Sequence, residues 1–301
     1  MTLRIGTSGW NYPSGRGTWT GIFYPLPEDR DRGFDELRFY AGRFNTVEVN
    51  STFYGQPRAT AALGWLKRTP AHFDFSVKLF QKFTHPGMTA GAITREDVDT
   101  FKAGIEPLAV SGRLGALLVQ FPPSFHDTDE ARGYLEWLLQ TFADYPLAVE
   151  LRHRTWSDRA GGTRALLDAH GSAWVQIDEP KFESSIAQDF SPGNSELFYV
   201  RLHGRNAAQW WDHAEAEDRY NYLYSPEELT PIAEKARAAR ALGKKVYLYL
   251  NNHFSASSVA NATMLKHMLD EPVTARMPAE LVERYPALEG IVPTFPRARL
   301  L

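Results

Sequence analysis

The segment LFYVRLHGR (197–205) decides the fold class, because its side chains alternate between two chemical kinds. One phase contains Phe198, Val200 and Leu202, and the other contains Tyr199, Arg201, His203 and Arg205. Strict alternation is typical of a β-strand, whose successive side chains point to opposite faces. Runs of this kind lie among segments with helical periodicity, so we expect helices to cover the apolar face. Its polar face must then point toward other strands.

Two more segments repeat the pattern. VEVNSTFY (47–54) is predicted to be one strand with Glu48, Asn50 and Thr52 on one face, and LAVELRH (147–153) places Glu150 and Arg152 together. Because these strands also lie between helical segments, we expect their polar faces to meet in the interior of the protein.

Eight segments of this kind predict the architecture. They are residues 3–10, 47–54, 73–80, 115–121, 147–152, 173–178, 197–204 and 245–252. Helical periodicity separates most of them, and cap residues predict helix starts at Thr94, with Asp97 three residues later, and at Ser225 before Pro226. The crossover at 180–195 lacks this periodicity and is predicted to be a loop. Eight strands with intervening helices in about 250 residues indicate an α/β protein, a (β/α)8 TIM barrel of parallel strands. A doubly wound open sheet is the main alternative, but no Gly-rich dinucleotide turn follows any predicted strand.

Composition favours one domain over residues 1–301, with 270–301 as a C-terminal extension, because no linker-like segment interrupts the alternation. The chain has no cysteine, which excludes disulfides and thiolate metal sites. The sequence enters the first strand at once and has no apolar run of membrane-spanning length, so a cytoplasmic protein without a membrane partner is expected. A net charge of −3 gives no overall attraction to nucleic acid.

The carboxyl ends of barrel strands carry function, and here they carry polar side chains. We expect three carboxylates, from Glu48, Glu150 and Asp178, to face three cations, from Lys78, Arg152 and Arg201. An unpaired buried charge costs several kcal/mol, about 3–5 when one partner is removed, so these groups should form a paired network. Alternatively, the network only fills the barrel.

Seven motifs occur in order over residues 4–262: GTSGWNY, FNTVEVNSTFY, VKLFQKFTH, LGALLVQFPPSF, VELRHRTW, RLHGRN and YLYLNNH. With this series the chain resembles the YecE-like family, also called domain of unknown function 72. The resemblance implies a (β/α)8 barrel and supplies no reaction. The positions that match the family's motifs are Trp10, Glu48, Asn50, Lys78, Glu150, Arg152, Arg201, His203 and Asn251.

Residue types suggest roles at the mouth of the barrel. The candidate catalytic residues are Glu48, Glu150, Asp178 and His203; the candidate substrate-binding residues are Trp10, Asn50, Tyr54, Lys78, Gln120, Arg152, Arg201, Arg205, Trp211, Tyr222 and Asn251. Arginine beside Glu150 should keep it ionised, and arginines beside His203 should keep the imidazole neutral. Converging lysine and arginine side chains would bind phosphate or carboxylate.

Long loops after the first and seventh strands are rich in aromatic residues. They supply Trp10, Tyr12, Trp19, Phe23 and Tyr24, and Trp210, Trp211, Tyr220, Tyr222 and Tyr224. These rings can stack on bases or sugars, or they can pack the loops as satellite cores.

Three functional classes follow. The first is an enzyme of hydrolase or lyase type, with hydrolase favoured, acting on an anionic, phosphorylated or nucleotide-like small molecule. The second is a glycoside hydrolase with paired carboxylates. The third is a non-catalytic protein that binds a ligand or nucleic acid. No cofactor is assigned: Glu150, Asp178 and His203 could hold a divalent metal, but Asn251 replaces a carboxylate and Arg152 lies beside them.

Overall fold

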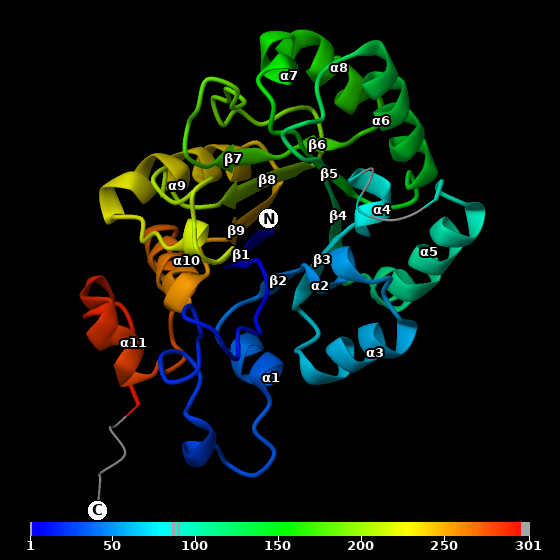
Figure 1. Cartoon of the computed structure of the whole chain (residues 1–301). Helices are drawn as coiled ribbons and strands as arrows, with labels where there is room; N and C mark the ends of the chain where they lie inside the picture. Colours follow the sequence, from blue (N-terminus) through cyan, green and yellow to red (C-terminus); the bar gives the residue numbers. More distant parts are fainter. Residues whose placement is uncertain (1, 86–87, 89–90, 296–301) are drawn as a thin grey trace, which may run out of the picture.

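The computed structural model describes residues 2–85, 88 and 91–295. These residues form an α/β fold with two parallel sheets, in the orders β1-β9-β8-β7 and β2-β3-β4-β5-β6. The strands are β1 (Leu3–Thr7), β2 (Thr46–Val49), β3 (Asp74–Lys78), β4 (Leu114–Gln120), β5 (Leu147–Glu150), β6 (Ala173–Trp174), β7 (Gln176–Asp178), β8 (Leu197–Leu202) and β9 (Lys245–Leu250). Figure 1 shows them in the centre of the molecule with the helices around them.

The predicted sixth strand is divided at Val175. Strand β6 pairs with β5, whereas β7 pairs with β8 on the other side. Between them, the side chain of Gln188 accepts a hydrogen bond from Ile177 N–H at 2.9 Å and donates to Val175 O at 2.8 Å. The side chain of a loop residue thus takes the place of a neighbouring strand. The loop at 180–195 lacks periodicity, as predicted, and its sequence did not predict this interruption of the sixth strand.

The other junction between the sheets is short. Within the described chain, β1 and β2 meet through one parallel bridge, Ser8 to Glu48, and Gly9 N–H donates to Glu48 O at 2.8 Å. The prediction of eight strands in one continuous barrel is therefore met only in part, because hydrogen bonding is interrupted at these two places.

The predicted strand at 47–54 also ends early. Strand β2 stops at Val49 and helix α2 begins at Ser51. The hydroxyl of Thr52 explains the turn, because it donates to Val49 O at 3.1 Å and to Lys78 O at 2.6 Å. Local side-chain bonds of this kind compete with a strand ladder.

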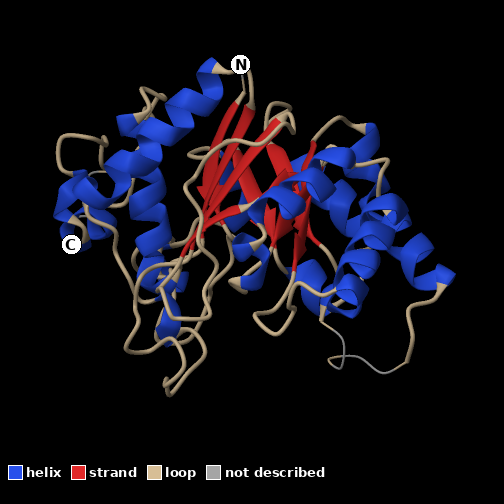
Figure 2. Cartoon of the chain, turned by 90° about the horizontal axis from the view of Figure 1, so that it is seen from above, coloured by secondary structure: helices blue, strands red, loops and turns tan. Residues whose placement is uncertain are grey.

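Helices lie outside the strands, as Figure 2 shows. They are α1 (Glu36–Ala41), α2 (Ser51–Tyr54), α3 (Ala59–Arg68), α4 (Gln81–Thr84), α5 (Arg95–Val110), α6 (Asp129–Thr141), α7 (Thr155–Asp158), α8 (Ala160–Ala169), α9 (Pro226–Ala241), α10 (Ser257–Met268) and α11 (Ala279–Arg284). Capping boxes start α5 at Thr94 and α9 at Ser225, as predicted. None of the described helices has the length and apolar composition needed to cross a membrane.

The apolar phases of the strands pack beneath these helices. Phe75 of β3 stacks on Trp65 of α3 with ring centroids 6.1 Å apart, and both are buried. The loop after β1 forms a satellite core of its own, in which Trp19, Phe23 and Tyr24 are at most 1% exposed. For these three aromatic residues, the interpretation that they pack the loop, rather than stack on a ligand, is confirmed.

Candidate functional site

Polar side chains fill the space between the two sheets. At the amino-terminal level, Tyr247 of β9 donates to Asp74 of β3 at 3.2 Å. At the next level, the hydroxyl of Tyr249 lies 2.6 Å from that of Thr46 and 2.9 Å from that of Ser76. Alternate residues of opposite sheets therefore point at one another, as the alternation predicted. The periodicity of the strands builds a hydrogen-bonded interior instead of an apolar one.

Arg201 of β8 is the centre of this interior. Its Nε and Nη2 donate to Glu48 at 3.0 and 2.7 Å, and its Nη1 donates to Glu150 at 2.5 Å. Tyr199 donates to the same Glu48 carboxylate at 2.8 Å. Arg201 is 2% exposed and both carboxylates are fully buried. Three of the five N–H groups of Arg201 are thus committed to protein carboxylates.

Charge holds Glu150 ionised. Burial alone would raise the pKa of Glu150, but the guanidinium groups of Arg201 and Arg152 outweigh burial and hold the pKa well below its usual range. Glu150 is consequently an ion-pair partner at neutral pH, and a general acid of glycosidase type needs the opposite shift. The ion pairs that Glu150 makes with Arg201 and Arg152 therefore argue for an electrostatic role of Glu150.

Arg152 connects the network to solvent. Its Nε donates to Glu150 at 2.7 Å, its Nη1 lies 3.5 Å from Glu179, and its side chain is 14% exposed. Burial raises the pKa of Glu179, against the opposing effect of Arg152. Glu179 was not among the predicted site residues, although it directly follows a predicted strand.

His203 is neutral, as predicted, because burial and the nearby Arg152 lower its pKa to about 3. Its Nδ1 lies 2.9 Å from the Asn251 amide, and its Nε2 lies 3.2 Å from Arg152 Nη2 and 3.5 Å from Glu150. Both ring nitrogens face protein groups and the ring is fully buried. In this arrangement His203 supports Arg152 and Glu150, and it does not reach the cavity described next.

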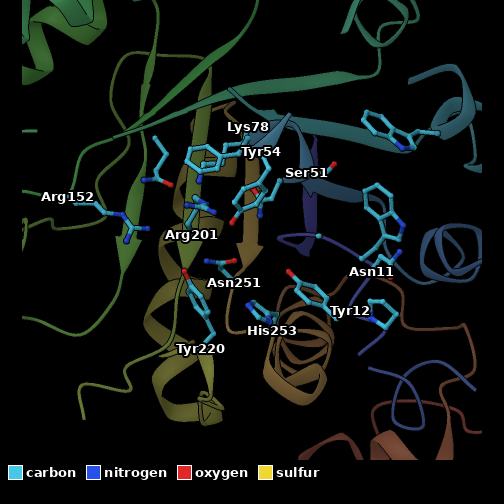
Figure 3. A pocket seen from close by; sticks show the side chains of 17 residues that line it. Asn11, Tyr12, Ser51, Tyr54, Lys78, Arg152, Arg201, Tyr220, Asn251 and His253 are labelled. Atoms are coloured by element: carbon cyan, nitrogen blue, oxygen red, sulfur yellow. The ribbon is translucent and has the colours of Figure 1, made fainter. Parts of the chain in front are cut away.

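A cavity of about 540 Å³ opens at the carboxyl ends of the strands. Figure 3 shows labelled side chains around it. It is lined by Gly9, Trp10, Asn11, Tyr12, Pro13, Asn50, Ser51, Phe53, Tyr54, Trp65, Lys78, Gln120, Arg152, Arg201, Tyr220, Asn251 and His253. We call it the central cavity. Its volume lies in the usual range for small-molecule sites, about 300–1,000 Å³.

Eight of the predicted site residues line the central cavity: Trp10, Asn50, Tyr54, Lys78, Gln120, Arg152, Arg201 and Asn251. Two of them have particular features. Asn50 Oδ1 is buried and lacks a hydrogen-bond partner among the described residues. Tyr54, on α2, is 76% exposed at the rim. Glu48, Glu150 and His203 lie behind the wall rather than on it.

Lys78 differs from both arginines. Its Nζ lies 3.8 Å from the centroid of the Phe53 ring, and within the described chain no carboxylate oxygen lies within 4.0 Å of it. Burial lowers the pKa of Lys78 to about 7, and the charge of Arg201 contributes in the same direction. Lys78 is therefore a cavity-facing amine without an ion-pair partner.

Four predicted site residues lie elsewhere. Asp178 of β7 is held by Arg205, with Nε and Nη2 each 2.8 Å away, and it accepts from Tyr224 at 2.8 Å. Tyr222 donates to Glu228 at 2.6 Å. This cluster lies against α9, because the loop that follows β8 turns back over the strand ends. The expectation that Asp178 faces the cavity cations was wrong.

Trp211 is also outside the central cavity. It is 62% exposed and its ring lies 5.8 Å from that of Phe182. Of the aromatic residues predicted after the seventh strand, Tyr220 alone lines the cavity in the described structure. Trp210 and Tyr224 are buried and pack their loop.

His253 is the most informative cavity residue missing from the predicted set. It lies between Tyr12 and Tyr220, with ring centroids 4.3 and 4.8 Å away. Burial lowers its pKa to about 4, and its buried Nδ1 has no partner among the described residues. The signal was available, because His253 follows the last predicted strand directly. The cavity-lining Phe53 and Trp65 carried no such signal, since both fit an apolar core.

The predicted trio of Glu150, Asp178 and His203 does not form a metal site in the described structure. Across the described residues, no three His, Asp or Glu side chains gather in an arrangement that could hold a metal ion. Glu150 pairs with Arg201, whereas Asp178 pairs with Arg205, so the trio of Glu150, Asp178 and His203 is not brought together.

Comparisons with known proteins agree on a family. A family model described as "Protein of unknown function DUF72" matches residues 4–283. The UPF0759 protein YunF of Bacillus subtilis is 28% identical over 93% of this chain and 99% of its own length. A crystal structure of a DUF72 family protein from Thermotoga maritima is 35% identical and covers 90% of this chain and 100% of its own, with a TM-score of 0.76. Another, from Enterococcus faecalis, is 26% identical over 89% of this chain and 96% of its own, with a TM-score of 0.77. The chain therefore belongs to the DUF72 family.

Proposed function

We propose that this protein is an enzyme that acts on an anionic, ring-containing small molecule, phosphorylated or nucleotide-like, in the central cavity. Charge is the main support. Arg201 and Arg152 are paired with Glu48, Glu150 and Glu179, whereas Lys78 faces the cavity without a carboxylate partner among the residues that the structure describes. The single observation that carries the proposal is this surplus cation, because a ligand anion would complete the network.

The walls fit the rest of such a ligand. Trp10 and Trp65 meet edge to face at 6.1 Å on one part of the wall, and Tyr12 and Tyr220 flank His253 on another. Aromatic faces of this kind bind sugar or base rings. The unpartnered Oδ1 of Asn50 adds an acceptor for a ligand hydroxyl or amine.

The same geometry bears on the type of reaction. Glu48 and Glu150 are fully buried and ion-paired behind the cavity wall. This position argues against a glycoside hydrolase, and against any hydrolase whose catalytic groups are a pair of carboxylates. The cavity presents an amine, a neutral imidazole and amides instead. We therefore favour the lyase alternative over the hydrolase. A non-catalytic ligand-binding protein is the remaining candidate, and nucleic acid is disfavoured by the net charge of −3.

We also infer that the two sheets act as one (β/α)8 barrel scaffold. The Ser8–Glu48 bridge joins β1 to β2, and the chain runs directly from β6 through Val175 into β7. Arg201 crosses between the sheets with three hydrogen bonds. These links would hold the strand ends, and hence the cavity, in a fixed geometry.

A ligand screen tests the proposal. Sugar phosphates, nucleotides, neutral sugars and short oligonucleotides are compared for their effect on the unfolding temperature, since a ligand that binds only the native state stabilises it. We expect phosphorylated compounds to stabilise the wild type, and we expect Lys78→Met to lose this effect. Stabilisation only by neutral sugars, or equal stabilisation of the variant, would show that the site is not an anion site.

A further inference from the structure

We propose that Lys78 forms an imine with the carbonyl group of a phosphorylated aldehyde or ketone bound in the central cavity. This inference rests on the proposed function, and it names both a covalent role for the amine and the substrate class. Lys78 ends strand β3, so its backbone is fixed by the sheet while its side chain faces the cavity. Figure 3 shows it on the cavity wall with Tyr54 and Arg201.

The first argument is the absence of an ion-pair partner. Lys82, four residues later, has its Nζ 2.7 Å from Asp97, so that amine has an ion-pair partner. Lys78 instead packs over the face of Phe53, with no carboxylate oxygen within 4.0 Å in the described part of the chain. A lysine buried in this way shifts toward its neutral form and becomes a nucleophile.

The second argument is the fraction of Lys78 side chains that are present as the neutral amine. Burial and then Arg201 lower the pKa of Lys78 from 10.5 to about 7. At pH 7 about half of the Lys78 side chains are therefore amines, about a thousandfold more than for a lysine with an ordinary pKa. The ammonium form attracts the anionic ligand, and the amine form attacks its carbonyl carbon.

The chemistry balances without a further reactant. The amine nitrogen bonds to the carbonyl carbon, giving a carbinolamine, and loss of water then breaks the carbon–oxygen bond. Overall, the ammonium and the carbonyl compound give a protonated imine and one water molecule, with the charge of +1 unchanged. The positive charge thus stays in the central cavity, and Arg152, which also lines it, would contribute to holding the phosphate of the ligand. Such an iminium withdraws electrons from the neighbouring carbon, as required for a lyase.

Reductive trapping tests this proposal. The protein is incubated at pH 7 with glyceraldehyde 3-phosphate and cyanoborohydride, and the modified lysines are mapped by mass spectrometry. We expect the main adduct on Lys78, formed at least about tenfold faster than on Lys82, because Lys78 faces the central cavity and its pKa is lowered to about 7, whereas the amine of Lys82 is paired with Asp97. Unphosphorylated glyceraldehyde should label Lys78 more slowly. Labelling that is even over all lysines, or that omits Lys78, would overturn the inference.

Variants separate the two proposals. Lys78→Arg retains a cation without a nucleophilic amine, so it should bind glycerol 3-phosphate, which has no carbonyl, and form no adduct at this position. Lys82→Met should form the Lys78 adduct at the wild-type rate. If the wild type binds glycerol 3-phosphate without forming an adduct, the imine is wrong and the anion site stands. If it binds neither compound, the proposed function fails as well.

Discussion

Replacing Arg201 with methionine should strongly destabilise the protein, because Arg201 neutralises two buried carboxylates at once. Glu48 would lose donors at 3.0 and 2.7 Å and, among the described residues, retain the hydroxyl of Tyr199. Glu150 would lose a donor at 2.5 Å and retain Arg152. Removing one partner of a buried ion pair costs about 3–5 kcal/mol. We expect the loss to lie at the upper end of this range, since the stranded Glu48 is fully buried.

Urea unfolding followed by tryptophan fluorescence measures this loss, and Arg205→Met is the matched control. Arg205 also pairs with a carboxylate, Asp178 at 2.8 Å, but its side chain is 38% exposed and Asp178 keeps the hydroxyl of Tyr224, so its removal should cost clearly less than removal of Arg201. Adding Glu48→Gln to Arg201→Met should restore part of the stability by removing the stranded charge. Equal effects of the two arginine variants, or no restoration by Glu48→Gln, would refute the reasoning.

The pH dependence of the free energy of unfolding provides a second test with Arg201→Met. In the wild type the lowered pKa of Glu150 contributes stability that is present above its usual pKa of 4.5 and is lost as the pH falls through the lower folded value. In Arg201→Met, Glu150 loses one of the two guanidinium groups that lower its pKa, so it should take up a proton more easily. The difference in unfolding free energy between wild type and variant should therefore shrink as the pH falls below about 4.5.

Three further predictions concern stability. Lys78→Met should be more stable than wild type at pH 7, and the difference should shrink as the pH rises toward 10.5. Above pH 7 the unfolded wild type binds a proton at Lys78 that the folded state releases, and this cost to folding disappears as the unfolded lysine also loses its proton. Urea titrations across this range check it, and a constant difference would contradict it. Tyr249→Phe should cost about 1–2 kcal/mol in the same assay, because Thr46 and Ser76 lose a buried hydroxyl partner, and an unchanged midpoint would count against the polar interior. Gly104→Ala should lower the thermal midpoint, because the new Cβ would lie 2.2 Å from Pro57 O. Gly64→Ala should raise the midpoint, because its Cβ would meet open space and alanine is a better helix former than glycine. A change of the same sign in both variants would contradict this packing.

The polar interior could be predicted from the sequence because the alternation of polar and apolar side chains is visible within a few consecutive residues of each strand. Glu48, Glu150 and Arg201 occupy the inward phase of their strands, and the strands bring them together as expected. The helix starts at Thr94 and Ser225 could likewise be predicted from a local signal, because each cap residue and its acidic partner lie three residues apart in the sequence. What the sequence could not supply was the path of the loops. Asp178 meets Arg205 and Tyr224, and not the cavity, because the chain after β8 folds back over the strand ends.

Distance in the chain likewise explains the missing cavity residues. His253 lies between Tyr12 and Tyr220, three residues from three different segments, and no short-range pattern couples them. The division of the sixth strand has a similar cause, because Gln188 reaches back to Val175 and Ile177 from a loop without periodicity. Nor could the sequence separate paired from unpaired cations. Arg201 and Arg152 have carboxylate partners, and only the folded structure distinguishes Lys78 from them.

The central claim is that Lys78 is the surplus cation of an anion site, and calorimetric titration of a phosphorylated ligand tests it most directly. Wild type, Lys78→Met and Lys82→Met are titrated at pH 6, where Lys78 is mainly charged. A lost charge-assisted hydrogen bond of about 1.5–3 kcal/mol predicts about 10- to 100-fold weaker binding in Lys78→Met. Binding should be unchanged in Lys82→Met, whose lysine is paired with Asp97. Equal affinity of Lys78→Met and wild type would contradict the claim.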